Sequence, residues 1–509
     1  MEVTMKKRMT AFLLVLALAL TLCACAKKAE DGEEFKKVDG ETDFSAITDP
    51  EDMEKKFTYK GYFLPAAYGP IQAYVGDTMP YYEDGTYYIY YLKQGADSYN
   101  HSIYLTQTTD FVNYTETEDV IIESNYDGGQ DGWVGTGSVV KVGGRYLFFY
   151  TGHHSSDYAE YKEKILVAEG TSLTSFTKKT DWELIPPEEL GQKNDFRDPQ
   201  AYVDEATGNI ILTVTASQGG VARILKFTLS ADLSSATYDG VIFTDPTGRF
   251  WNLECSDTFK LGDKYYITYS GQDDTLWYAM SDAPYGPYGD AYRLDAKLFY
   301  AAKHVEGKDG TYMVGWARRS EYADDTERVV AWAGNMAVQK LCQNADGTLY
   351  LAPADSIAAQ YTVRRELNID SMSATIASGS RYSYTDVFTA YESFMLKGSF
   401  KFDGNGDFGL AFDYNGEKES YKLITLSPSE GTLSLSFNEG LTPVTETLAA
   451  LEAGREYTFT YIQEGSVGTF YVDGVAALTV RLYGVAGKPV RLFCEENTVE
   501  FTGLKEYTR

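Results

Sequence analysis

Histidine and cysteine are scarce in this chain, which has only four histidines and five cysteines in 509 residues. Cys23 and Cys25 end an apolar N-terminal run, while Cys255, Cys342 and Cys494 are scattered over the rest of the chain. An odd, scattered set excludes a disulfide framework, and the lack of clustered cysteine and histidine argues against a zinc site. We therefore expect packing alone to stabilise the fold, with no metal and no cofactor.

Basic residues are also in short supply. The 45 lysines and arginines are outnumbered by 74 aspartates and glutamates, which gives a formal net charge of −29. So acidic a surface repels phosphate backbones, and nucleic acid is excluded as an expected partner. A neutral ligand rich in hydroxyl groups is not repelled by this charge.

Long segments with the 3.6-residue period of an amphipathic helix are missing between residues 61 and 361. In their place stand short runs of tyrosine, phenylalanine, isoleucine and valine, which glycine, aspartate and asparagine turns separate. Aromatic residues make up 15% of the chain, and 42 of them are tyrosines. Tyrosine favours strands and also stacks on sugar rings, so this composition indicates an all-β protein and is compatible with a carbohydrate ligand.

The strand-forming runs of residues 61–361 belong to a repeat of roughly 50 to 60 residues, the spacing of propeller blades. In each of five units a polar or aromatic residue precedes the start of an aromatic-rich strand by a similar distance, and these residues are Asp77, Thr136, Asp198, Glu254 and Tyr300. Equivalent positions in a radial repeat lie at equal distances from the axis. The pattern therefore predicts a five-bladed β-propeller in which three acids converge on one central opening.

Residues 362–509 show a different pattern, with evenly spaced strands of period 2. An Asp-Gly pair between apolar runs, at Asp473 and Gly474, is a hairpin signal. These features predict a C-terminal β-sandwich. It carries no acids at positions equivalent to those of the repeat. We therefore expect it to support the propeller or to contact glycans, and not to take part in catalysis.

The N-terminus has the features of an export signal. Three basic residues precede a short apolar run, and Leu22 and Ala24 stand at positions −3 and −1 before Cys25. This arrangement resembles a bacterial lipobox, in which Cys25 is the lipid attachment site; an ordinary cleaved signal is the alternative. We expect residues 1–25 to be a lipoprotein signal peptide and the charged residues 26–60 to be a flexible acidic tether. The protein is then exported and anchored to the bacterial cell membrane by this lipid alone.

The three in-phase acids suit glycoside cleavage, which commonly uses two carboxyl groups with different roles. Glu254 lies among apolar neighbours in sequence, which favour the protonated form and therefore an acid/base role. Asp77 lies among small residues typical of a turn, where backbone N–H groups stabilise an anion, so it is the better nucleophile. Asp198 follows Arg197, whose charge is expected to lower the pKa of that carboxyl and keep it ionised.

Several motifs resemble glycoside hydrolase family 32, the invertase, levanase and inulinase group. The Arg-Asp-Pro triplet at 197–199 and the Glu-Cys pair at 254–255 resemble two of the family's motifs. Further similar segments follow the family's order, at residues 109–114, 135–138, 148–152, 298–301, 315–319 and 332–334. Each motif is weak by itself, but their order over residues 60–365 is specific.

The resemblance implies a five-bladed propeller followed by a sandwich, and a retaining double displacement at the C2 atom of a β-fructosyl group. It also implies that Asp77 is the nucleophile, that Glu254 is the acid/base, and that Asp198 binds fructosyl hydroxyls. Around these catalytic residues we expect five substrate-binding side chains, which are Arg197, Thr136, Trp133, Trp251 and Tyr300.

The sequence departs from the family's pattern around these acids. Gly76 stands where the family has an asparagine that contacts the sugar, Leu92 where a glutamine is common, and Leu253 where a tryptophan is usual. Two alternatives to a β-fructosidase therefore stay open at this point. One is a five-bladed hydrolase of arabinan or xylan, and the other is a non-catalytic surface lipoprotein that binds glycans.

Overall fold

The computed structural model describes residues 59–67, 72–95, 101–125, 128–156, 158–191, 193–320, 330–369, 372–374, 382–415, 420–437 and 443–509. The predicted signal peptide, the lipid attachment site Cys25 and all but the last two residues of the predicted tether lie outside these ranges. No helix within these ranges has the length and apolar character needed to cross a membrane.

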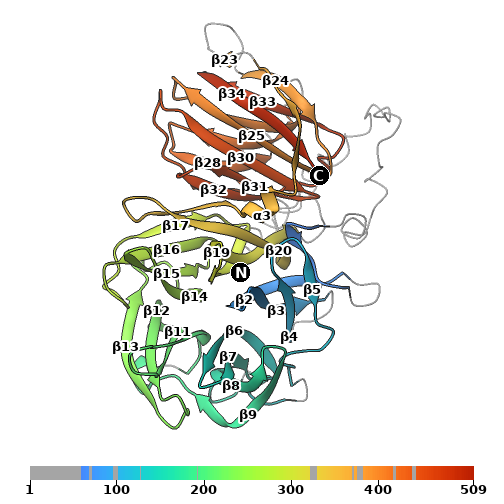
Figure 1. Ribbon diagram of the computed structural model, residues 1–509. Coiled ribbons are helices and arrows are strands. Elements are labelled where there is room, and N and C mark those ends of the chain that lie inside the picture. Colours follow the sequence, from blue (N-terminus) through green and yellow to red (C-terminus); the bar gives the residue numbers. More distant parts are fainter. Residues whose placement is uncertain are drawn as a thin grey trace, which may run out of the picture. The chain divides into compact units, whose positions relative to one another are not determined.

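The described residues form an almost entirely β structure, as the sequence predicts, with a five-bladed β-propeller followed by a β-sandwich (Figure 1). Their two short helical segments are η2 (Glu188–Leu190) and α3 (Asp355–Ala358).

Each blade is an antiparallel sheet whose first strand lies nearest the centre of the ring (Figure 1). The first blade contains β2 (Tyr74–Glu83), β3 (Thr86–Gln94), β4 (Ile103–Thr108) and β5 (Tyr114–Glu116). The second contains β6 (Trp133–Val142), β7 (Arg145–His153), β8 (Glu163–Ser172) and β9 (Ser175–Leu184). The third contains β10 (Phe196–Val203), β11 (Ile210–Gln218), β12 (Val221–Leu229) and β13 (Ala236–Thr244). The fourth contains β14 (Glu254–Leu261), β15 (Lys264–Ser270), β16 (Leu276–Ser281) and β17 (Ala291–Asp295).

The fifth blade closes the ring by joining the first in one continuous sheet. It contains β18 (Phe299–Gly307), β19 (Gly310–Ser320), β20 (Val330–Gln343) and β21 (Leu349–Pro353). Strand β20 pairs with β2 at Val75 and Gly334, and the short β1 (Tyr62–Phe63) also pairs with β20. The first strands β2, β6, β10, β14 and β18 contact their neighbours around the ring, so residues far apart in the sequence meet at its centre.

Much of the tyrosine content packs between blades. Tyr90 of the first blade meets Phe148 of the second edge to face, with ring centroids 4.9 Å apart. Tyr90, Tyr150 and Tyr269 are almost completely buried. Interleaved aromatic rings of this kind bury large areas and stabilise the contacts between sheets. Packing therefore accounts for part of the abundance of tyrosine.

The C-terminal sandwich consists of two antiparallel sheets. One sheet contains β22 (Thr362–Glu366), β23 (Met372–Ala374), β25 (Ser393–Phe402), β30 (Tyr457–Glu464), β31 (Val467–Val472), β32 (Ala476–Arg481) and β34 (Asn497–Thr508). The other contains β24 (Tyr382–Thr389), β26 (Phe408–Asn415), β27 (Ser420–Ser427), β28 (Thr432–Phe437), β29 (Thr445–Leu448) and β33 (Pro489–Glu495). Buried leucines, valines and phenylalanines of both sheets form its core.

Candidate active site

A β-bulge recurs in the first strand of every blade and gives the centre of the ring its geometry. The pairing between the first and second strands shifts at Asp77 in β2, at Thr136 in β6, after Arg197 in β10, after Glu254 in β14 and after Tyr300 in β18. A bulge inserts extra residues into one strand and re-aims their side chains. The five positions singled out in the sequence therefore all lie at, or directly before, a bulge.

The pairing of the first and second strands shows that these five residues do not occupy equivalent positions in their blades. The equivalence inferred from their spacing in the sequence is therefore corrected. Arg197, Glu254 and Tyr300 each occupy the last paired position before the bulge, and we call these three residues the outer tier. Asp77, Thr136, Asp198 and Cys255 each follow that position, and we call these four residues the inner tier. Asp198 is thus the counterpart of Cys255, and Glu254 is the counterpart of Arg197.

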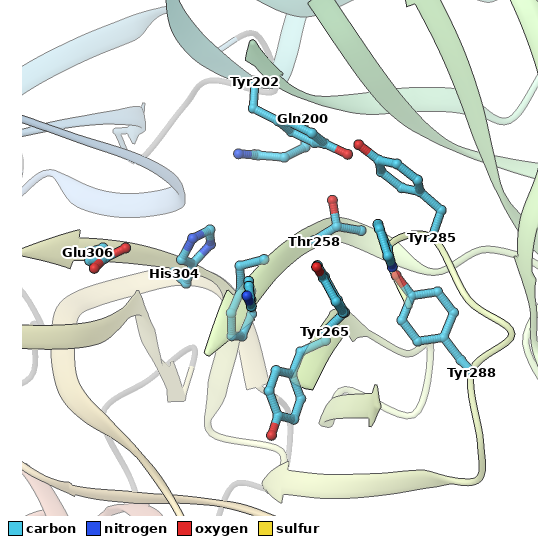
Figure 2. A pocket seen from close by; sticks show the side chains of 12 residues that line it. Gln200, Tyr202, Thr258, Tyr265, Tyr285, Tyr288, His304 and Glu306 are labelled. Carbon is cyan, nitrogen blue, oxygen red and sulfur yellow. The ribbon is translucent and has the colours of Figure 1, made fainter. Parts of the chain in front are cut away.

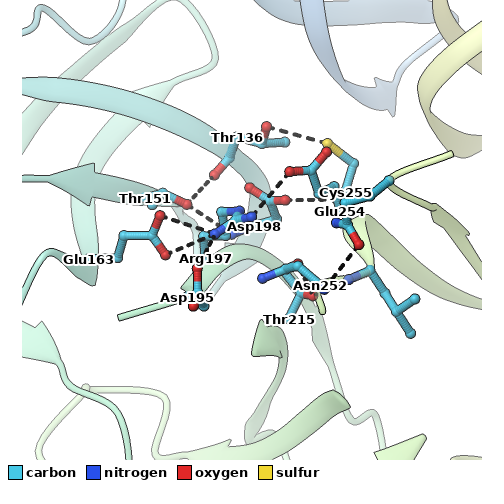
Figure 3. A network of polar contacts seen from close by, with 12 residues as sticks. Thr136, Thr151, Glu163, Asp195, Arg197, Asp198, Thr215, Asn252, Glu254 and Cys255 are labelled. Carbon is cyan, nitrogen blue, oxygen red and sulfur yellow. Dashed lines mark hydrogen bonds and ion pairs between the residues drawn. The ribbon is translucent and has the colours of Figure 1, made fainter. Parts of the chain in front are cut away.

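Within the inner tier, residues from four blades bond to one another, and Figure 3 shows three of them, Thr136, Asp198 and Cys255. The Thr136 hydroxyl donates to Asp77 Oδ2 at 2.8 Å and lies 3.5 Å from the sulfur of Cys255. The backbone N–H of Cys255 donates to Asp198 Oδ2 at 2.7 Å. Backbone φ angles of +56° at Asp198 and +50° at Cys255 accompany their bulges. The bulges therefore bring Asp77 and Asp198 into one bonded cluster.

Asp77 lies in a strand, and not in the turn that its small neighbours indicate. Its second oxygen, Oδ1, accepts a hydrogen bond from the indole Nε1 of Trp316 at 3.1 Å. Burial raises the pKa of this carboxyl, and the charge of Glu254 adds to the rise, while the donors Thr136 and Trp316 oppose it. Side chains, and not the backbone of a turn, supply the two donors that hold this carboxyl in place.

Asp198 behaves differently from the sequence prediction. Burial raises its pKa to about 6, and Asp77 and Glu254 also raise it, although Arg197 acts in the opposite direction. The guanidinium of Arg197 forms its ion pairs with Glu163, Asp195 and Glu254 rather than with Asp198. The expected lowering of this pKa is therefore wrong, since desolvation outweighs the neighbouring positive charge.

In the outer tier, Glu254 is held between two donors. Arg197 Nη2 donates to Glu254 Oε1 at 3.1 Å, and the Tyr300 hydroxyl donates to Oε2 at 2.5 Å. Glu254 thus has a charged and polar setting, although its neighbours in sequence are apolar. Its side chain is 28% exposed, while Asp198 is 4% exposed, so Glu254 is the more accessible of these two acids.

Arg197 is itself fixed by buried acids. Glu163 accepts from Arg197 Nη1 and from the backbone N–H of Phe196, and His153 lies 3.2 Å from the same carboxylate. The charge of Arg197 lowers the pKa of Glu163 to about 2, against the effect of burial. Arg197 therefore stays in place as a fixed cation beside Glu254.

The two predicted aromatic walls differ from the packed tryptophans of the interior. Trp251 is 44% exposed and Trp133 is 38% exposed. The Arg197 guanidinium lies over the ring of Trp251 at 5.2 Å, and Lys162 lies over the ring of Trp133 at 5.5 Å. Trp251 therefore adjoins the outer tier through Arg197, while Trp133 precedes the inner-tier residue Thr136 on the same strand.

Gly76 leaves a space beside Asp77 that Trp332 fills. A Cβ atom at position 76 would lie 2.1 Å from the Trp332 ring, which is closer than any real contact. The Trp332 ring stacks on His101 at 4.2 Å and meets Trp316 edge to face at 5.8 Å. The site at Asp77 is therefore shaped by a tryptophan that comes from β20, 256 positions along the chain.

Sequence reasoning missed Trp316, Trp332 and Glu163 as parts of the site. The first two fell within family-like segments but carried no sign of their contact with Asp77 or Gly76. Glu163 begins β8, whose sequence alone shows nothing to distinguish it from a surface acid. The spacing of the repeat could have indicated Trp316, because it pairs with Tyr300 across the fifth blade.

Comparisons with known proteins agree with this architecture. The family model for the glycosyl hydrolases family 32 N-terminal domain matches residues 76–353. Sucrose-6-phosphate hydrolase of Escherichia coli is 26% identical over 277 residues, which cover 50% of this chain and 57% of that protein. The aligned part thus spans little more than half the length of this curated relative.

Solved structures are similar over nearly their whole length. Sucrose-6-phosphate hydrolase from Lactobacillus gasseri gives a TM-score of 0.67 at 16% identity and covers 92% of this chain and 98% of that chain. Exo-inulinase from Aspergillus awamori gives 0.68 at 15% identity, with 88% and 98% covered. Fructan 1-exohydrolase IIa from Cichorium intybus gives 0.68 at 14% identity, with 88% and 97% covered. These likenesses establish the propeller and the sandwich.

Proposed function

The chain belongs to glycosyl hydrolase family 32, and we propose that it cleaves β-fructosidic bonds in fructans, fructo-oligosaccharides or related fructosyl sugars. One observation carries the proposal: Asp77, Asp198 and Glu254, from three different blades, belong to two contiguous tiers of bonded side chains at the centre of the ring. The names of the relatives, which include a sucrose-6-phosphate hydrolase and an exo-inulinase, support the choice of fructosides.

In the proposed reaction Asp77 attacks the C2 atom of the fructosyl group, and Glu254 gives a proton to the departing oxygen. The bond from C2 to the leaving group breaks as the bond from C2 to an Asp77 oxygen forms. Glu254 then takes a proton from water, the water oxygen attacks C2, and Asp77 is released. The β configuration is retained because C2 is attacked twice.

The contacts of each acid suit its proposed role. Thr136 and Trp316 donate to the two oxygens of Asp77, so this carboxylate is oriented and its negative charge is stabilised. Tyr300 and Arg197 hold Glu254, whose side chain is 28% exposed, so a leaving group and water can reach it. Asp198 lies in the buried inner tier, and in this proposal it accepts hydrogen bonds from fructosyl hydroxyls.

Replacing Glu254 tests the proposal. Glu254→Gln keeps the shape of the side chain but removes its proton transfer, so we expect fructose release from sucrose, inulin or levan to fall about 10²–10⁴-fold. Glu205→Gln, at an exposed turn, is the matched control and is expected to keep full activity. Chromatography of the products measures both. Wild-type fructose release by Glu254→Gln would refute the assignment.

We also propose that the protein is exported and anchored to the cell membrane through a lipid on Cys25. The support is the basic and apolar pattern before Cys25 and the charged segment that follows it. An extracellular position suits an enzyme that acts on glycans too large to enter the cell.

A further inference from the structure

A cavity of about 350 Å³ (Figure 2) lies farther along three of the strands that carry the proposed catalytic residues and their partners. Gln200 and Tyr202 line it from β10, Thr258 from β14, and His304 from β18. These residues follow the outer-tier residues of their own strands by three to five positions, with a bulge in between, which corresponds to at most about 10–17 Å along a strand. The cavity is therefore separate from the proposed catalytic cluster, although both use the same first strands.

Aromatic rings form most of the wall of this cavity. Tyr202, Tyr265, Tyr285 and Tyr288 are each partly exposed at it, in contrast to the tyrosines that pack between blades. Tyr202 and Tyr285 come from different blades, and their rings are nearly parallel, at 12° with centroids 6.1 Å apart. Flat, partly exposed rings of this kind can take the apolar face of a sugar ring and present a hydroxyl at its edge.

Polar groups with fixed orientations complete the wall. The buried Lys303 amino group donates to Gln200 Oε1 at 3.1 Å, which holds that amide in place. Fully buried Asp257 lies 2.6 Å from His304 Nδ1 and also accepts from the His304 backbone N–H. The two contacts with Asp257 hold the His304 ring in a fixed orientation.

The hydroxyls of Tyr202 and Tyr288 stay protonated at neutral pH, because the pKa of each is raised. Burial raises the pKa of Tyr202, and a hydrogen bond to Tyr285 raises it further. Burial also raises the pKa of Tyr288. The cavity therefore offers tyrosine hydroxyls, an imidazole nitrogen and an oriented amide, which can pair with the hydroxyl groups of a sugar.

The charges at the cavity do not favour an anionic ligand. The exposed Lys260 and Glu306 have opposite signs and give no net charge to the lining. The net charge of −29 over the whole chain repels anions. The volume lies near the lower end of the range of about 300–1,000 Å³ for small-molecule pockets, so it suits one or two sugar rings.

We propose that this cavity is a second carbohydrate site, which binds a neutral mono- or disaccharide without cleaving it. A sugar bound there contacts the C-terminal halves of β10, β14 and β18, while the two tiers remain free to act on another molecule. The inference stands on the geometry of the cavity and does not require the proposed hydrolase activity.

The four histidines provide a direct test, because each gives a separate signal after labelling with ¹³C at Cε1. His304 reports the cavity, His153 reports the catalytic cluster through its contact with Glu163, and the half-buried loop residue His154 serves as the internal control. Glu254→Gln protein prevents turnover during titration with fructose and with sucrose. We expect the His304 signal to shift with a dissociation constant of about 1–10 mM, while the His154 signal stays constant.

Substitutions at Thr258 decide whether that shift comes from the cavity. Thr258→Phe places a ring in the middle of the space and is expected to abolish the His304 response, while Thr258→Val keeps the volume free and the response. Tyr285 lies in a loop, and Tyr285→Ser removes one aromatic wall of the cavity without adding bulk to it. This variant is expected to bind sugar at least tenfold more weakly. In the wild-type background, fructose release shows that each variant is folded.

An unchanged His304 signal at saturating sugar, or an equal response in Thr258→Phe, would overturn the second site. Neither result would contradict the proposed hydrolase activity, provided that the wild-type protein releases fructose and the His153 signal responds to sugar. Conversely, a His304 response in a protein without hydrolase activity supports the second site and contradicts the proposed function.

Discussion

Asp198→Asn is expected to make the protein more stable at neutral pH while it lowers activity. Asp198 is 4% exposed, and its pKa rises from 3.8 to about 6 because burial disfavours the charged form. Asparagine has nearly the same shape and keeps an oxygen to accept the Cys255 N–H, but it has no charge to desolvate. The variant therefore removes a cost that the wild-type fold carries.

The sign and size of the effect follow from proton linkage. Because the folded pKa lies above the unfolded value, the folded state binds more protons between pH 3.8 and about 6, and wild-type stability falls as pH rises through this window. At about 1.36 kcal/mol per pH unit, the loss amounts to about 3 kcal/mol above pH 6. Asp198→Asn should be more stable than wild type by about 2–3 kcal/mol at pH 7, and by much less at pH 4.

Tryptophan fluorescence during urea unfolding measures this difference, because all six tryptophans lie between residues 133 and 332, in the propeller. Asp263→Asn, at an exposed turn, is the control and should change little at either pH. Fructose release should fall in Asp198→Asn, because the charge that accepts from sugar hydroxyls is lost. If Asp198→Asn is no more stable than wild type at pH 7, the account of this buried carboxyl is wrong.

Two further variants test the site and the anchor. Gly76→Ala should destabilise the propeller by about 1–3 kcal/mol, because the added Cβ collides with the Trp332 ring. In the Trp332→Ala background the same substitution should cost nothing. An equal cost in both backgrounds would contradict the contact between Gly76 and Trp332. Cys25→Ala should move the protein from the membrane fraction to the soluble fraction and abolish fatty-acid labelling, whereas Cys23→Ala should leave both unchanged. Immunoblots of separated fractions measure this, and membrane association of Cys25→Ala would contradict the lipid anchor.

The sequence by itself determined the strand content, the fivefold repeat and the three acids. These features are local: alternating apolar residues specify a strand, and a repeat in the chain specifies a repeat in space. The order of the motifs was enough to place Asp77, Asp198 and Glu254 in the same family-like positions. Neither the spacing nor the motifs, however, distinguished the outer tier from the inner tier.

Only the tertiary structure decided how the acids are arranged and what surrounds them. Relative to the bulge in its own strand, Glu254 lies one position before the place that Asp198 takes in its strand. A bulge leaves no mark in a sequence of otherwise regular strands, so the sequence could not show this difference. The contacts of Trp316 with Asp77 and of Trp332 with Gly76 join the fifth blade to the first, so they exist only because the ring closes. The pKa of Asp198 likewise depends on burial by other blades, which outweighs the adjacent Arg197, because desolvation is a property of the assembled interior and not of neighbours along the chain.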